Sequence, residues 1–130
     1  MTPRALIVDD SLTVRMDLAD ALRSAGFEVL LASDAAQART LIQLEPLDLL
    51  ILDVLLPDGD GVEILAEVRE TEVGKELAVM MLSTEAEVSD RVRAIRSGAD
   101  EYVGKPYDVN HVLVRARELV AARRSSSAAT

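Results

Sequence analysis

The chain has 130 residues, with 14 Lys and Arg against 23 Asp and Glu, so its net charge at pH 7 is −9. This length suits one domain with one hydrophobic core, which must be aliphatic because hydrophobic residues make up 49% of the chain and aromatic residues only 2%. The negative charge and the shortage of aromatic side chains exclude a domain that grips nucleic-acid phosphates or stacks on bases, so we expect no direct nucleic-acid contact.

Short apolar runs predict five β-strands in chain order. The runs are Ala5–Val8, Val29–Ala32, Leu49–Leu52, Ala78–Leu82 and Glu101–Gly104. Apolar side chains stand at consecutive positions in these runs, which is typical of strands that are buried on both faces of a parallel sheet.

Segments with helical spacing of apolar residues lie between and after the strands. They cover about 11–26, 34–44, 61–68, 88–98 and 108–120. Strands that alternate with helices predict right-handed βαβ units, and therefore an α/β fold with helices on both faces of one parallel sheet. We expect one domain over residues 1–122. Residues 123–130 are small and polar apart from two arginines, and we expect a flexible tail or the start of a linker there, frayed from Ser125 onward.

The cysteine content and the N-terminal sequence indicate the cellular compartment of the protein. The chain has no Cys, which suits a reducing compartment, and its single histidine, His111, cannot form a multi-histidine metal site. No signal-peptide pattern is present, and no apolar run approaches the ~18 residues that span a bilayer. We therefore expect a soluble cytoplasmic protein that makes no membrane contact.

Polar side chains stand where the apolar runs stop. Asp9 and Asp10 follow the first run, Asp53 the third, Ser83 the fourth and Lys105 the fifth. One Asp after a strand is more often a turn former or a helix cap. In an open α/β sheet, however, ligands bind outside the carboxyl ends of the strands, so polar residues at four of five such ends predict a common site.

These residue types favour phosphate chemistry. Close carboxylates repel one another, and oxygen-only ligands suit a hard cation such as Mg²⁺, which accepts one or two carboxylates and a phosphate oxygen. Lys105 and Ser83 are placed to bind a phosphoryl group. Since the site offers no Cys or His, the nucleophile should be a carboxylate; Asp53 stands alone, while Asp9 and Asp10 form a pair suited to the metal.

The chain resembles the response-regulator receiver domains of two-component signalling from about Arg4 to Ala122. The resemblance rests on Asp9-Asp10, on Asp53 with the segment 56–61, on Ser83-Thr84 and on the segment 102–106. It implies a flavodoxin-like fold of five parallel strands in the order 2-1-3-4-5.

The resemblance also implies a function for each site residue. Asp9 and Asp10 would hold Mg²⁺ together with Asp53, which would accept phosphate from a sensor histidine kinase or a phosphotransfer protein. Ser83 and Lys105 would bind the phosphoryl group. The resemblance thus implies a signalling domain rather than an enzyme, and we expect only self-phosphorylation and autodephosphorylation chemistry.

The resemblance assigns a switch to Ser83 and Tyr102. In the active state the Ser83 hydroxyl would move toward the phosphate and Tyr102 would turn inward, changing the face of the fourth helix, the fifth strand and the fifth helix that meets a downstream protein or effector domain. Without the resemblance, Tyr102 would be an ordinary strand residue with its hydroxyl in water. The family also implies a cis peptide bond between Lys105 and Pro106.

Two features depart from the family. Thr84 stands where Ala or Gly is common, and the loop after Asp53 is unusually acidic at Asp58 and Asp60. We expect these features to alter the lifetime of the phosphate rather than to abolish the chemistry.

Two other functions remain open from the sequence. One is a Mg²⁺-dependent aspartyl-phosphate phosphatase of the haloacid-dehalogenase type, although the run Asp53-Val54-Leu55 lacks the second Asp of its D-x-D motif. The other is a binding-only pseudo-receiver, which the complete set of acids, hydroxyl and lysine disfavours. The arginines at 91, 93 and 96 could form a partner-docking strip or simply a solvated helix face.

Overall fold

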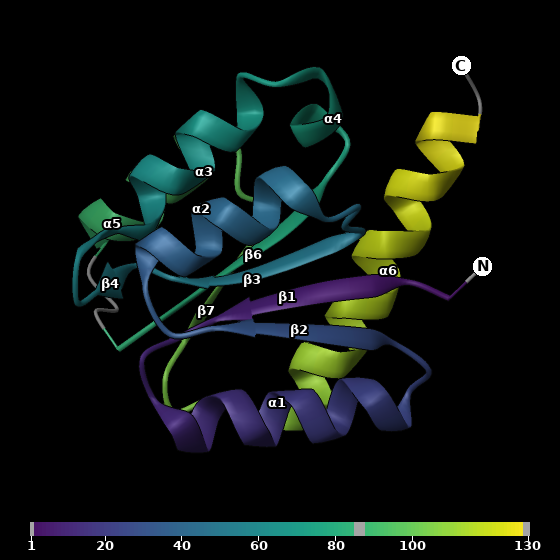
Figure 1. Cartoon of the computed structure of the whole chain (residues 1–130), viewed down its shortest axis with the longest axis horizontal. Coiled ribbons are helices and arrows are strands. Elements are labelled where there is room, and N and C mark those ends of the chain that lie inside the picture. Colours follow the sequence, from purple (N-terminus) through teal and green to yellow (C-terminus); the bar gives the residue numbers. More distant parts are fainter. Residues whose placement is uncertain (1, 85–87, 129–130) are drawn as a thin grey trace.

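A five-stranded parallel sheet forms the centre of the molecule. The computed structural model describes residues 2–84 and 88–128. The sheet contains β1 (Arg4–Val8), β2 (Glu28–Ala32), β3 (Leu49–Asp53), β6 (Ala78–Ser83) and β7 (Glu101–Gly104). Their order across the sheet is β2-β1-β3-β6-β7 (Figure 1), which confirms the predicted flavodoxin-like order 2-1-3-4-5.

Five longer helices cover the two faces of the sheet (Figure 1). They are α1 (Leu12–Ser24), α2 (Ala35–Leu44), α3 (Gly61–Arg69), α5 (Val88–Arg96) and α6 (Val109–Ala128). Helices α1 and α6 pack on one face, and α2, α3 and α5 on the other. Ser11 caps α1 through its side-chain oxygen, which accepts a hydrogen bond from the Val14 amide, and α1 is followed by Gly26 at a φ of 94°.

The strands divide their side chains between two hydrophobic clusters. Leu6 and Val8 of β1 face α2, α3 and α5, whereas Ala5 and Ile7 face α1 and α6. All four are at most 1% exposed. Burial on both faces explains why the strands are apolar at consecutive positions rather than at alternate ones.

Three short elements were not predicted. The loop after Asp53 folds into an antiparallel ribbon of β4 (Leu55–Leu56) and β5 (Gly59–Asp60), and a single helical turn, α4 (Glu72–Lys75), follows α3. Elements of two to four residues are too short to carry a hydrophobic period, so the sequence pattern contains no signal for them.

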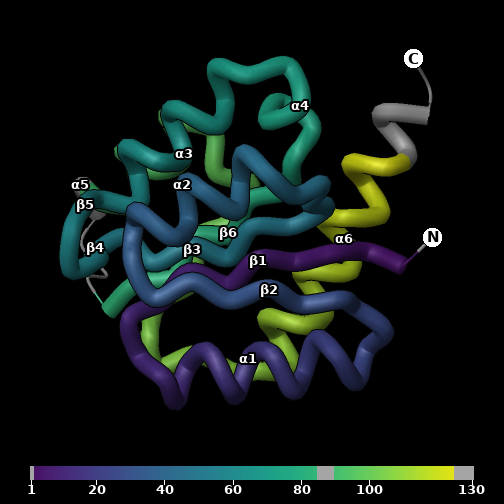
Figure 2. The backbone as a smooth tube through the Cα atoms, viewed as in Figure 1, coloured from purple at the N-terminus to yellow at the C-terminus, as the bar shows by residue number. Residues whose placement is uncertain are grey.

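The C-terminal segment differs from the expectation of an irregular tail over 123–130. Helix α6 continues to Ala128, and residues 129–130 lie outside the described residues. The segment 109–128 contains no Gly or Pro, and Arg123 and Arg124 form ion pairs with Asp100 and Asp48, so packing extends the helix. Residues 119–124 of α6 and the start of β1 lie on the same side of the molecule (Figure 2). The domain limit at residue 122 stays a prediction.

The helices were also compared with the requirements of a membrane span. Over residues 2–84 and 88–128, no helix combines the length and the apolar character needed to cross a bilayer.

Candidate functional site

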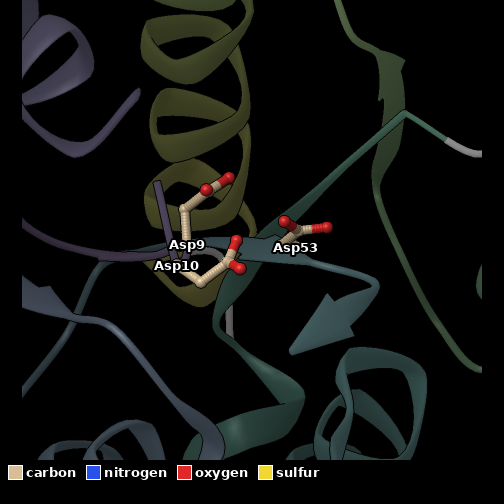
Figure 3. Close-up of side chains that lie close together, drawn as sticks. All are labelled: Asp9, Asp10 and Asp53. Atoms are coloured by element: carbon tan, nitrogen blue, oxygen red, sulfur yellow. The ribbon is translucent and has the colours of Figure 1, made fainter. Parts of the chain in front are cut away.

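Three carboxylates meet at the carboxyl ends of β1 and β3 (Figure 3). Asp9 and Asp10 directly follow β1, and Asp53 is the last residue of β3, which pairs with β1 in parallel. Each side chain offers an oxygen within 4.8 Å of the other two. Asp9 is 1% exposed and Asp53 is 5% exposed, whereas Asp10 faces solvent. The structure thus brings together the three acids that the sequence placed at two strand ends.

Lys105 reaches this acidic group from the end of β7. Its Nζ donates a hydrogen bond to Oδ2 of Asp53 at 3.0 Å and lies 2.6 Å from Oδ2 of Asp9 in an ion pair. Its backbone amide donates to the carbonyl of Ser83 at 2.8 Å. The Lys105–Pro106 peptide bond is cis, the isomer that the family resemblance implies.

The environment shifts the ionisation of both Asp53 and Lys105. Burial raises the pKa of the Asp53 carboxyl above its ordinary value, and Asp9 adds to the effect, while the hydrogen bond from Lys105 opposes it. Burial by itself would lower the pKa of Lys105, but Asp9 and Asp53 outweigh it and raise that pKa. Lys105 is therefore a permanent cation at neutral pH, and one cation does not compensate three acids.

The donor set fits a hard divalent cation. Oδ2 of Asp9 is buried and has no hydrogen-bond partner within the described part of the chain, although Lys105 pairs with it as a charge. Oδ1 of Asp9 accepts a hydrogen bond from the Ser11 amide at 2.9 Å, which fixes the carboxylate. Three carboxylates without nitrogen or sulfur ligands, one of them open to solvent, match the preferences of Mg²⁺.

Ser83 closes another side of the same edge. It is the last residue of β6, it is fully buried, and β6 lies next to β3 with Leu82 paired to Asp53. Thr84 follows it and is exposed. The two residues of the Ser83-Thr84 motif therefore differ in environment. Ser83 belongs to the interior of the site, and Thr84 belongs to its surface.

Glycine at position 61 allows the loop to pass close to Asp53. The Gly61 amide donates to the carbonyl of Val54 at 2.7 Å, and a Cβ at Gly61 would overlap the carbonyl oxygen of Asp53. The sequence indicated Gly61 as the start of a helix and as the last residue of the family segment 56–61. Its close approach to the Asp53 carbonyl is a tertiary contact that no local pattern reveals.

The acidic residues of the loop after Asp53 do not line the site. Both carboxylate oxygens of Asp58 accept hydrogen bonds from the first amides of α2, Ala35 at 2.7 Å and Ala36 at 3.1 Å. These bonds lower the pKa of Asp58. Asp60 caps α3 by accepting from the Val62 amide. Both acids therefore cap helices in this structure, and the predicted effect of the acidic loop on phosphate lifetime stays a prediction.

Tyr102 lies in the interior rather than in water. It is 6% exposed and belongs to the core cluster shared with α3 and α5, and the guanidinium of Arg91 lies 5.4 Å from its ring centroid. Arg93 forms an ion pair with Asp60 at 2.7 Å. Two of the three arginines of α5 therefore make contacts within the chain. These contacts disfavour the interpretation of the three arginines as a strip that is free to dock a partner.

Comparisons with known proteins agree with this geometry. A family model described as "Response regulator receiver domain" matches residues 5–117. The chain is 36% identical over 129 residues to "Response regulator MprA" of Mycobacterium bovis (strain BCG / Pasteur 1173P2), covering 99% of this chain and 55% of that protein. The chain therefore spans about half the length of the curated relatives it matches.

Solved structures share the fold. The crystal structure of a response regulator receiver domain protein (CheY-like) from Methanospirillum hungatei JF-1 superimposes on this chain with a TM-score of 0.91 at 26% sequence identity. The match covers 97% of this chain and 99% of that one. A putative response regulator from Chloroflexus aurantiacus J-10-fl has a TM-score of 0.87 at 34% identity, covering 93% and 99%. From the family match, the sheet order and the converging acids, the chain belongs to the response-regulator receiver domains, the signalling domains of two-component systems.

Proposed function

We propose that Asp53 is the phosphoacceptor of a cytoplasmic His-to-Asp relay and takes its phosphoryl group from a histidine kinase or a phosphotransfer protein. One observation carries this proposal: the Asp53 carboxylate is buried at the edge of the sheet, hydrogen-bonded to Lys105 and within 4.8 Å of Asp9 and Asp10. A nucleophilic carboxylate surrounded by charge-neutralising groups suits phosphoryl transfer.

The residues divide the chemistry between them. A carboxylate oxygen of Asp53 forms a bond to phosphorus while the bond between phosphorus and the donor imidazole breaks. The imidazole leaves with the electron pair of that bond as a neutral ring, because its second nitrogen already carries a proton in the phosphorylated donor. Lys105 offsets the charge of the phosphoryl oxygens, and the Ser83 hydroxyl donates a hydrogen bond to one of them. Asp9, Asp10 and Asp53 would hold Mg²⁺, which when bound supplies further charge neutralisation.

The proposed output is a change of the face formed by α5, β7 and α6, which are the fourth helix, fifth strand and fifth helix of the family pattern. New phosphate charge draws Ser83 toward Asp53, and a ligand shifts a two-state equilibrium only by binding one state more tightly. Tyr102 of β7 and Arg91 of α5 belong to this face, where the Arg91 guanidinium lies 5.4 Å from the centroid of the Tyr102 ring. We propose a downstream protein or effector domain as the partner, and no direct nucleic-acid contact by this domain, whose net charge is −9.

Acetyl phosphate with Mg²⁺ tests the phosphoacceptor role. Intact mass should increase by about 80 Da, one phosphoryl group, and the adduct should be stable in acid and labile in base. Asp53→Asn should abolish it, whereas Asp58→Asn, which changes an acid of the same loop that caps α2, should retain it. An unmodified wild-type protein would refute the proposal, and continuous release of inorganic phosphate at enzymatic rates would favour the phosphatase.

Thr84 provides a second test within the same proposal. Its exposed, β-branched side chain follows Ser83 directly, where it can limit access of water to the phosphate. Decay of the Asp53 phosphate should therefore be faster in Thr84→Ala than in the wild type. Equal decay rates would remove Thr84 from the control of phosphate lifetime while leaving the phosphoacceptor role intact.

A further inference from the structure

A groove of about 480 Å³ lies between α2, α3 and α4. Leu47 and Leu77, which precede β3 and β6, contribute to its lining, so the groove lies at the amino ends of the strands, opposite the Asp53 edge. Half of the other lining residues have apolar side chains, among them Ile42, Ile64 and Val68. Its volume falls within the roughly 300–1,000 Å³ of sites that bind small ligands or several side chains.

Two apolar side chains at this groove are strongly exposed. Leu44, the last residue of α2, is 73% exposed, and Val73 of α4 is 79% exposed. Among the described residues, the other large apolar side chains that are exposed belong to α1, β4, α5 and α6, and are Leu12, Met16, Leu55, Val92, Ile95 and Val114. The proposed phosphoacceptor role and its output face therefore do not explain why the apolar side chains of Leu44 and Val73 are exposed.

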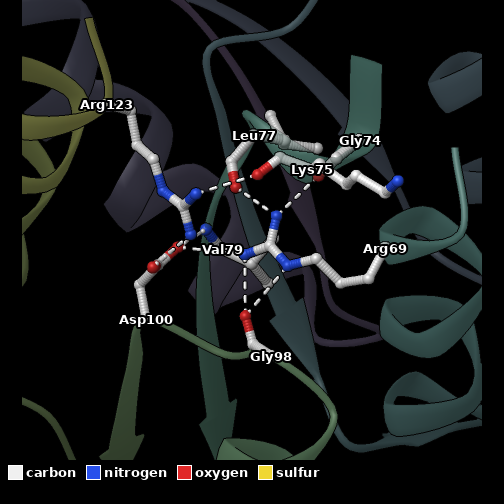
Figure 4. Close-up of polar contacts among 8 residues, drawn as sticks. All are labelled: Arg69, Gly74, Lys75, Leu77, Val79, Gly98, Asp100 and Arg123. Carbon is white, nitrogen blue, oxygen red and sulfur yellow. Dashed lines mark hydrogen bonds and ion pairs between the residues drawn. The ribbon is translucent and has the colours of Figure 1, made fainter. Parts of the chain in front are cut away.

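Arg69 holds the α4 wall of the groove in place (Figure 4). Its Nη1 donates to the carbonyls of Gly74 at 2.6 Å and Leu77 at 2.5 Å. The Thr71 hydroxyl accepts from the Gly74 amide and donates to the Val68 carbonyl, and a Cβ at Gly74 would overlap that same carbonyl. The wall is thus pre-formed, which reduces the conformational entropy lost when a partner binds.

The segment that forms the α3 and α4 walls of the groove is acidic, and its exposed glutamates are called the glutamate rim. The segment 63–76 carries five exposed glutamates against two cations; the glutamates are Glu63, Glu67, Glu70, Glu72 and Glu76. Arg69, one of the cations, is only 14% exposed, and the other, Lys75, is paired with Glu72 at 3.0 Å. Arg39 of α2 is paired with Glu67 at 2.9 Å, so Glu63, Glu70 and Glu76 are the rim glutamates without an ion pair among the described residues. A complementary partner therefore carries Lys or Arg beside its apolar residues.

A second copy of this chain fits the groove poorly. The copy would also carry a net charge of −9. Its basic helix, α6, uses its apolar face in its own core, where Val112 and Val120 are 1% and 6% exposed. The occupant is therefore a different protein.

We propose that this groove binds a basic amphipathic helix of another protein, with apolar side chains at i, i+3 or i+4, and i+7 inserted between Leu44 and Val73 and with Lys or Arg facing the glutamate rim. The proposal is independent of phosphorylation at Asp53. It assigns the receiver a second docking surface at the end of the sheet opposite the phosphoacceptor.

A fluorescein-labelled model peptide tests the proposal with the full chain. The probe has Leu at i, i+3, i+4 and i+7 and Lys at its flanking positions, and its binding is followed by fluorescence anisotropy. We expect saturable binding that Val73→Asp weakens about tenfold or more, while Val114→Asp, a matched change of an exposed valine on α6, leaves the dissociation constant within about twofold. Amide chemical-shift changes should concentrate on α2, α3 and α4.

Four results would overturn the proposal. Equal binding of a peptide of the same composition in scrambled order would indicate charge attraction alone. Equal weakening by Val73→Asp and Val114→Asp would place the binding outside the groove, and the absence of any binding would remove the docking surface. Sedimentation equilibrium of the free chain checks the remaining occupant: a dimer that Val73→Asp dissociates would show that a second copy fills the groove.

Discussion

Replacing Arg69 by Met should strongly destabilise the fold. The guanidinium donates to three carbonyl oxygens, those of Gly74, Leu77 and Gly98, and forms an ion pair with Asp100 at 3.1 Å. These partners connect α3 with α4, with the segments before β6 and β7, and through Asp100 with Arg123 of α6 (Figure 4). Met keeps the apolar stem of the side chain and removes every one of these bonds.

The size of the effect follows from burial. The side chains of Arg69 and Asp100 are only 14% and 18% exposed, so water cannot fully replace the lost bonds. A hydrogen bond to a charged group contributes about 1.5–3 kcal/mol, but burial lowers the pKa of Arg69, which shows that its charge is partly desolvated and offsets some of the gain. Asp100 also keeps Arg123. We expect a loss of about 3–5 kcal/mol in the free energy of unfolding.

Urea unfolding followed by circular dichroism measures this loss. With a slope of about 2 kcal/mol per molar, the midpoint should fall by roughly 2 M. Arg39→Met is the matched control, because it removes the ion pair between Arg39 and Glu67. The two side chains of this pair are 39% and 53% exposed, so its loss should cost less than about 1 kcal/mol in the free energy of unfolding. Arg69→Lys keeps the positive charge but lacks the several N–H donors of the guanidinium, so its loss of stability should lie between those of Arg69→Met and Arg39→Met. A loss below 1 kcal/mol in Arg69→Met would refute the reasoning.

Three further outcomes are expected. The pKa of the Asp53 carboxyl is raised above its ordinary value, so the folded state binds the carboxyl proton more tightly than the unfolded state and loses stability as pH rises. Asp53→Asn should therefore raise the urea midpoint at pH 7, and this gain should disappear near pH 3. Mg²⁺ at one hundred times its dissociation constant should stabilise the wild type and Asp58→Asn by about 2.7 kcal/mol but Asp9→Asn far less, and equal stabilisation in calorimetry would contradict the metal assignment. Gly61→Ala should destabilise by about 1–3 kcal/mol through overlap with the Asp53 carbonyl, and Gly104→Ala, where a Cβ meets open space, should be nearly neutral in the same urea assay.

Much of the fold and the site could be predicted because buried parallel strands leave a strong local signal. Consecutive apolar residues mark each strand, and the residue after each run must lie at the carboxyl edge of the sheet. The apolar runs therefore predict Asp9, Asp10 and Asp53 at one edge of the sheet, and the family resemblance predicts that their strands are neighbours. Their oxygens do lie within 4.8 Å of one another. The burial of Tyr102 and the distinction between buried Ser83 and exposed Thr84 could not be read from the sequence, since both depend on how neighbouring elements cover the strand ends.

The sequence by itself determined the alternation of strands and helices, the sheet they form and the acids at its edge, because these depend on periodicity and on where each run stops. Only the tertiary structure decided which distant residues meet. Asp58 caps a helix that begins 23 positions earlier, Arg69 pairs with Asp100 across 31 positions, and α6 continues to Ala128 where Arg123 and Arg124 find acidic partners. Such contacts satisfy individual polar groups once the layers are packed, and no local pattern records them.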